Sequence, residues 1–104
     1  MSILVVFALL FQVISPSTTI TVTETMPKYH NSSAFGVAIC EFNKVHIEIW
    51  RSSNIQTLLH EFAHAYDCLD NGVFDGSPID GLCEPSLDCA EAYANKVEYT
   101  YEYR

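Results

Sequence analysis

The feature that most constrains the fold of this chain is the segment His-Glu-Phe-Ala-His at residues 60–64. Four residues advance an α-helix by slightly more than one turn, so His60 and His64 project from the same face and can share one metal ion. Glu61 lies about 100° further round that helix, within reach of a water at the metal without being a ligand itself. This arrangement predicts a zinc site in which Glu61 acts as general base.

The residues around this motif have the periodicity of an amphipathic helix. Ser53 followed by Gln56 is typical of a capping box at a helix start, and Asn71-Gly72 is typical of a helix end. An ordinary helix with two surface histidines is the alternative, which the adjacent glutamate and the apolar opposite side disfavour. The residues expected to face the core recur at three- and four-residue steps: Ile55, Leu58, Leu59, Phe62, Tyr66 and Leu69.

The start of the chain has the character of a secretory signal peptide. Residues 3–14 are apolar except for Gln12, and the small-residue segment 15–17 follows them at a plausible cleavage point. The apolar run is shorter than the roughly 20 residues that a membrane-spanning helix needs. No Lys or Arg precedes it, and a buried first strand is the alternative. We predict a signal peptide over residues 1–17 and one secreted domain over 18–104, with no stable membrane association after cleavage.

Four cysteines are candidates for the disulfide bonds of a small domain in an oxidising compartment. Sequence alone does not separate their possible pairings. Cys68 ends the metal helix, and Cys83 and Cys89 flank the next helix, so we expect one bridge to join these helices. Thiolate metal binding is disfavoured because no Cys-x-x-Cys pair is present. Cys40 is the fourth cysteine, and Asn31 begins an Asn-x-Ser sequence that is a candidate for glycosylation.

The formal net charge of −8 limits the classes of partner. Nucleic acid and anionic membrane surfaces are poor partners for a chain of this charge. A basic peptide suits the field of an acidic protein, although acidic surfaces also serve solubility alone. We expect a peptide or protein substrate, and the composition indicates no oligomeric state.

The remaining elements predict an α+β fold. β-Branched residues at 18–25 indicate a strand, and the segments 35–40 and 45–50 are typical of a hairpin. Gly, Pro and Asp at 70–86 indicate a loop, and apolar periodicity from residue 87 to about 103 indicates a second helix. The alternating residues of the second hairpin strand that are expected to face the metal helix are Val45, Ile47 and Ile49.

A zinc site needs a third protein ligand besides His60 and His64. Asp67 follows His64 by three residues, which suits a hydrogen bond to a ligand imidazole better than direct coordination. Glu91 lies on the next predicted helix, after a loop long enough to bring that helix back across the first. His46 is more typical of a solvated strand residue than of a ligand. The candidates for the third ligand are Asp67, Glu91, Glu98 and His46.

The motif at residues 60–64 followed by Glu91 resembles zincin metallopeptidases of the gluzincin type, whose third ligand is a helical glutamate. Residues 57–67 and 89–94 are similar to the mitochondrial inner-membrane metallopeptidases that process an ATP synthase subunit. The segment around Glu91 also resembles lethal-factor and Pro-Pro endopeptidase-like domains. The resemblance implies a minimal zincin-like α+β fold, with a small antiparallel or mixed sheet, the active-site helix and a second C-terminal helix. It also implies one zinc ion with three protein ligands, and Glu61 as general base. The implied ligands are His60, His64 and Glu91.

We therefore expect a small secreted zinc metallopeptidase that hydrolyses peptide bonds. The strand at 45–50, if it forms a sheet edge, can pair with an extended substrate. Glu84 stands where the lethal-factor-like enzymes place an oxyanion-stabilising tyrosine. The alternatives are therefore a catalytically inactive zincin-like secreted binding protein and a truncated metallopeptidase. The candidates for the oxyanion donor are Tyr93, Tyr29, His30 and His46.

Overall fold

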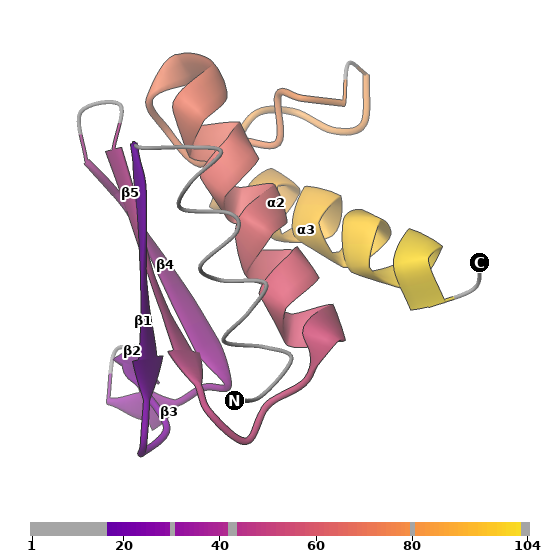
Figure 1. Ribbon diagram of the computed structural model, residues 1–104. Coiled ribbons are helices and arrows are strands. Elements are labelled where there is room, and N and C mark those ends of the chain that lie inside the picture. Colours follow the sequence, from indigo (N-terminus) through magenta and orange to yellow (C-terminus); the bar gives the residue numbers. More distant parts are fainter. Residues whose placement is uncertain (1–16, 30, 42–43, 80, 103–104) are drawn as a thin grey trace.

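The computed structural model describes residues 17–29, 31–41, 44–79 and 81–102, and these form an α+β fold (Figure 1). Helix α2 lies between a three-stranded sheet and helix α3, so the sheet and the two helices form successive layers. The α+β class expected from the sequence is confirmed. The predicted signal peptide lies, except for its last residue, outside the described residues. The main elements are β1 (Thr18–Thr23), β4 (Gly36–Glu41), β5 (Lys44–Trp50), α2 (Ile55–Asn71) and α3 (Leu87–Glu102).

The strand order of the sheet is β1-β5-β4, so β5 is its central strand. β1 runs parallel to β5, with Thr18 opposite Val45, and β4 runs antiparallel to β5, with Gly36 opposite Ile49. A strand with neighbours on both sides has no free backbone groups for a further strand. The suggestion that residues 45–50 form a substrate-pairing edge is therefore wrong, and β1 and β4 are the edges of the sheet that the described residues form.

A second, two-stranded ladder lies between the predicted strands at 18–25 and 35–40. β2 (Lys28–Tyr29) pairs antiparallel with β3 (Ser32–Ser33). Asn31 lies in the turn between them, where it is exposed and has a φ of 67°. Asparagine tolerates this left-handed conformation better than most residues, which suits the turn. The glycosylation candidate therefore lies at an exposed turn, and His30 lies outside the described residues.

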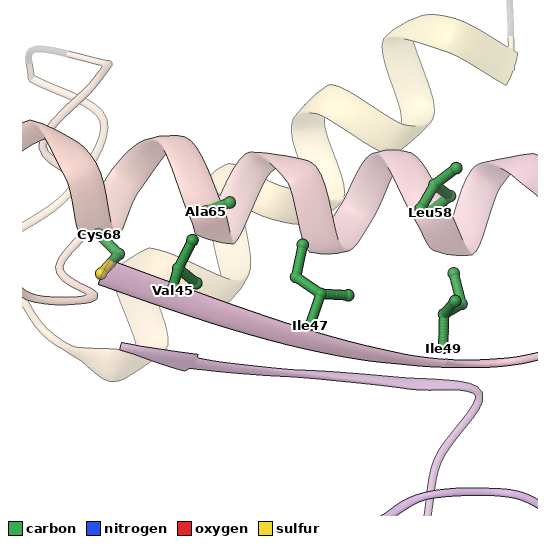
Figure 2. Packing of buried hydrophobic residues seen from close by; sticks show 6 residues of the cluster. All are labelled: Val45, Ile47, Ile49, Leu58, Ala65 and Cys68. Atoms are coloured by element: carbon green, nitrogen blue, oxygen red, sulfur yellow. The ribbon is translucent and has the colours of Figure 1, made fainter. Parts of the chain in front are cut away.

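The main core forms between β5 and α2 (Figure 2). Val45, Ile47 and Ile49 point from the central strand toward the helix, and each is at most 1% exposed. This confirms the predicted inward face of that strand. Full burial of a Val, Leu or Ile side chain contributes about 1.5–3 kcal/mol, so this contact fixes the helix on the sheet. The helix residues that meet the strand are Leu58, Ala65 and Cys68.

The C-terminal end of α2 lies at the predicted residue, and the N-cap lies one residue after the predicted position. The N-cap is Asn54 and not Ser53, because the Asn54 side chain accepts a hydrogen bond of 3.0 Å from the backbone N–H of Thr57. Gly72 ends the helix as predicted. Its φ of 86° is left-handed, and its N–H donates to the carbonyl of Cys68 at 2.7 Å.

The buried face of α2 differs from the predicted face. Tyr66 was expected in the core but is 61% exposed, whereas Ala63 and Ala65 are buried. The reason is that two layers cover the helix: Ala65 faces the sheet, while Ala63 packs against Tyr93 and Ala94 of α3. Small side chains on the second face allow the two helices to approach closely, which brings α3 to the histidine motif.

The four cysteines form two disulfide bonds. Cys40 of β4 is bonded to Cys68 of α2, with Cα atoms 5.7 Å apart, and Cys83 is bonded to Cys89, with Cα atoms 5.8 Å apart. The expected bridge between α2 and α3 is wrong, because Cys68 lies on the sheet-facing side of its helix. The Cys40–Cys68 bond fixes the edge strand β4 to α2. Within the described ranges, no helix is both long and apolar enough to cross a membrane.

Gly76 gives a test of how the loop between α2 and α3 is packed. Its φ is +79°, and a Cβ atom there would lie 2.7 Å from the carbonyl oxygen of Cys89. Gly81 has a similar φ of +77° but open space around it. We expect Gly81→Ala to lower the free energy of unfolding by about 1 kcal/mol from backbone strain alone, and Gly76→Ala by roughly 2–4 kcal/mol because overpacking is added. Urea denaturation measures both, and equal losses would contradict the close packing of Gly76.

Candidate metal centre

The two histidines of the motif lie next to each other on α2. The ring centroids of His60 and His64 are 4.9 Å apart, and the ring planes make an angle of 76°. Both side chains are largely covered, with exposed fractions of 15% and 10%. The one-turn spacing predicted from the sequence therefore brings two imidazoles to the same place on the helix.

Glu91 of α3 completes this cluster. Its Oε1 lies 2.8 Å from His60 Nε2, and its Oε2 lies 3.0 Å from His64 Nε2. One carboxylate thus faces both rings, each through the Nε2 atom. Ligand atoms of the three residues all lie within 4.8 Å of one another, so His60, His64 and Glu91 can hold a metal ion. The helix packing through Ala63 and Ala94 makes this approach of α3 possible.

The pKa shifts in the cluster are those expected of a site that favours a cation. Burial lowers the pKa of His60, but its hydrogen bond to Glu91 and the nearby carboxylates outweigh burial, so the pKa is raised above 6.5. Hydrogen bonds to His60 and His64 lower the pKa of Glu91 well below its ordinary value, against the opposing effect of burial. The folded chain therefore favours positive charge between these three groups, which a proton or a metal ion can supply.

Glu61 lies beside the cluster and is only 5% exposed. Burial raises the pKa of its carboxyl group above 4.5, and this outweighs the attraction of His64 and His60, which lowers the pKa. A carboxylate with a raised pKa is a better proton acceptor near neutral pH than an exposed one. Its position and its chemistry suit the general base that the motif predicts.

Glu98 approaches the opposite side of His60. It lies two helical turns after Glu91, and its Oε2 is 3.6 Å from His60 Nδ1. An acid near the Nδ1 atom favours the proton on that nitrogen, which leaves Nε2 free for a metal ion. Glu98 was a candidate for the third ligand, and the structure places Glu91 rather than Glu98 against the two Nε2 atoms.

Asp67 contacts the loop after α2. Its Oδ2 accepts hydrogen bonds from the backbone N–H groups of Asp75 and Gly76, at 3.0 and 2.8 Å. Burial raises its pKa despite the hydrogen bond from Gly76. The expected hydrogen bond to a ligand imidazole is not formed: His64 Nδ1 and Asp67 Oδ1 are both buried without a partner in the part of the chain that the structure describes. Asp67 therefore fixes the loop to α2.

The candidates for the oxyanion donor lie in different places. His46 accepts or donates a 2.7 Å hydrogen bond with Thr19 on the other face of the sheet, away from Glu91. Tyr93 is buried in the helix interface, and burial raises its pKa. Tyr29 of β2 lines the same cavity as the histidines and Glu61. Among the described candidates, Tyr29 alone lines this cavity.

A cavity of about 380 Å³ opens onto the cluster. Its walls come from β2, β4, α2, α3 and the segments that follow β3 and α2, and they are mostly apolar outside the ligand group. Leu87, at the start of α3, and Tyr29 are both exposed at this cavity. No local pattern in the sequence predicts this cavity, because its wall residues come from segments that meet only in the folded chain. The apolar wall residues are Tyr29, Ala34, Val37, Ala38, Phe74, Leu87 and Ala90.

The raised pKa of His60 predicts how metal affinity depends on pH. A metal ion must displace the proton on the ring, and the folded metal-free chain retains that proton to a higher pH than free histidine does. Zinc affinity should therefore rise with pH up to the raised pKa, and fall at least about tenfold per pH unit below it. Competition with a coloured chelator between about pH 5 and about pH 9 measures this.

Glu98→Gln is a matched variant for this measurement. The charge of Glu98 contributes to the raised pKa of His60, so removing it should move the fall in affinity to lower pH. An affinity that does not change between about pH 5 and about pH 8 would contradict the role of His60 as a ligand.

Comparisons with known proteins find no match for this chain among protein-family models, curated proteins or solved structures.

Proposed function

We propose that this protein is a zinc metallopeptidase. The observation that carries the proposal is the convergence of two imidazole Nε2 atoms and one carboxylate from another helix, with a buried acid beside them. Histidines and acids with no shared role have no need to be covered in this way or to be brought together from two helices. A catalytic zinc site has three protein ligands of these types and leaves a further position for water or substrate.

The donor set favours zinc over the other common divalent ions. Calcium and magnesium prefer sites built from oxygen atoms, whereas two of the three donors here are imidazole nitrogens. A His₂Glu set is one that catalytic zinc uses. The lowered pKa of Glu91 keeps its carboxylate ionised, which suits a cation ligand.

Bound zinc supplies Lewis-acid chemistry, which polarises a carbonyl group and acidifies water. Glu61 then accepts a proton from the attacking water and donates it to the leaving amine. Burial of the Glu61 carboxylate strengthens this proton transfer, because the charge is poorly solvated there. Tyr29 is among the residues that line the cavity, and we propose its O–H group as the donor to a developing oxyanion.

The edge strand β4 suits an extended peptide substrate. Among the described residues it pairs with β5 on one side only, and Gly36 to Ala38 line the cavity beside the cluster. Strand addition to such an edge supplies backbone hydrogen bonds without regard to sequence. The apolar cavity walls then favour substrates with a large apolar side chain next to the cleaved bond.

Extracellular location is part of the proposal. The chain has two disulfide bonds. Disulfide bonds persist in oxidising compartments and are rare in cytosolic proteins. The two bonds of this chain lie in a small domain, in which the Cys40–Cys68 bond fixes the edge strand β4 to α2. An acidic protein in that compartment also attracts basic peptides.

Cleavage of a diverse peptide library tests the proposal. The protein is purified with its disulfide bonds intact, and products are identified by mass spectrometry with zinc, with a chelator and after zinc is restored. We expect cleavage that the chelator removes and zinc restores, with apolar residues enriched next to the cleaved bond. Bound zinc without cleavage would favour the inactive binding protein, and a chain that stays unfolded with zinc would favour a truncated metallopeptidase.

A further inference from the structure

Gly36, at the start of the edge strand, lies directly beside the candidate general base. In the ladder it is opposite Ile49, whose fully buried side chain points toward α2. Residues directly opposite each other in an antiparallel pair place their side chains on the same face of the sheet. A side chain at position 36 would therefore point toward α2, where Glu61 is.

The side chain of Glu61 fills the space that a larger residue would need. A Cβ atom at Gly36 would lie 2.9 Å from Glu61 Cγ and 3.1 Å from Glu61 Oε2. It would also lie 3.3 Å from Thr57 Cγ2. Favourable contacts between carbon atoms are about 3.5–4.0 Å. The Cβ atom of any other residue at position 36 would therefore lie too close to Glu61 Cγ. The left-handed glycines among the described residues are Gly72, Gly76 and Gly81, so the backbone at position 36 does not itself require glycine.

We propose that Gly36 is a positioning residue for Glu61: the absence of a side chain lets the carboxylate lie between the edge strand and the two histidines. A side chain at this position displaces the carboxylate from the place where it can accept a proton. The catalytic consequence rests on the proposed function, whereas the contact between Gly36 and Glu61 does not.

The side chain of Glu61 gives way before the backbone does. β4 is held by its ladder with β5 and by the disulfide bond between Cys40 and Cys68. Glu61 is attached to α2 through rotatable bonds, and the atoms closest to a new Cβ are Cγ and Oε2 of that side chain. Rotation toward solvent also removes the cost of burying the carboxylate. The Gly36→Ala variant is therefore expected to fold.

The experiment compares wild type, Gly36→Ala, Glu61→Gln and the double variant. We expect Gly36→Ala to keep its zinc and to lose at least about 100-fold in peptide hydrolysis, the lower end of what a positioned general base contributes. In the Glu61→Gln background the same change should cause no further loss, because no base remains to be displaced. A loss that multiplies in the double variant would overturn the proposal.

A second readout does not depend on activity. Carbodiimide labelling of the metal-free protein, read by mass spectrometry, reports the exposure of each carboxylate. Glu61 should react several-fold faster in Gly36→Ala than in wild type, while the exposed Glu84 reacts equally in both and serves as the internal reference. Unchanged labelling of Glu61 would overturn the proposal. If wild type cleaves no peptide but labelling changes as expected, the proposed function fails and the positioning of Glu61 by Gly36 stands.

The neighbouring threonine supplies a control. Thr57→Ser removes the Cγ2 atom that a Cβ at Gly36 would also approach, and it keeps the hydroxyl group that donates to Asn54. Adding Thr57→Ser to Gly36→Ala should not restore hydrolysis, because the contact with Glu61 remains. Restored hydrolysis would show that Thr57, and not Glu61, is displaced, and would overturn the proposal.

Discussion

Replacing Glu61 by glutamine is expected to reduce peptide hydrolysis by about 10²–10⁴-fold while zinc binding is retained. Glutamine has nearly the same shape as glutamate but cannot accept the proton of the attacking water. Glu61 is not one of the three residues whose ligand atoms converge, so its replacement leaves the ligand set intact. Because burial raises the pKa of Glu61, the neutral amide should not lower the stability of the folded chain. Steady-state hydrolysis and zinc content are measured on the same preparations.

Glu84→Gln is the control for the loss of one negative charge. Glu84 lies in the loop before α3 and is exposed. Its replacement should leave both hydrolysis and zinc content at the wild-type level. Retained hydrolysis in Glu61→Gln would contradict the role of Glu61 as general base, whatever the zinc content.

Removal of the Cys40–Cys68 bond is expected to lower the free energy of unfolding by about 4 kcal/mol. The bond closes a segment with a sequence separation of 28, and the chain-entropy cost of cross-linking grows with the length of the closed loop. Domains of this size have stabilities of roughly 5–15 kcal/mol, so this loss is a large share of the total. Urea denaturation of the Cys40→Ala/Cys68→Ala variant measures it.

The second disulfide bond is the matched comparison. Cys83 and Cys89 have a sequence separation of only 6, for which the same relation gives about 2 kcal/mol. The Cys83→Ala/Cys89→Ala variant should therefore lose less stability than the Cys40→Ala/Cys68→Ala variant. The reverse order would contradict the view that fixing β4 to α2 is the main contribution of the disulfide bonds.

Local patterns in the sequence predicted the elements of the fold well. Apolar alternation in residues 45–50 fixed the inward face of β5, and the helical period placed His60 and His64 together. The cap was placed one residue early, at Ser53, because Ser and Asn are both good N-caps and only the bond to the Thr57 N–H separates them. These features depend on residues that are close in the chain.

Features that depend on how elements pack were predicted less well. Tyr66 was placed in the core because the pattern does not show that a second helix covers α2 on its alanine side. The partner of Cys68 depended on which side of its helix faces the sheet. The position of β5 at the centre of the sheet required the parallel pairing of β1, which no local pattern indicates.

The same difference between local patterns and the packing of elements applies to the candidate site. The spacing on one helix suffices for His60, His64 and Glu61, whereas the place of Glu91 depends on the crossing of α3 over α2. Gly36 carries no signal in the sequence, because its importance comes from the side chain that lies against it.

Zinc content measured by mass spectrometry after gel filtration, for wild type and Glu91→Ala, tests most directly whether two histidines and a carboxylate from α3 hold one metal ion. Asp67→Asn and Glu84→Ala are the controls, because Asp67 contacts the loop and Glu84 is exposed. We predict about one zinc ion per chain in wild type and both controls, and a clear loss in Glu91→Ala. Equal zinc content in Glu91→Ala and wild type would contradict the proposed metal centre.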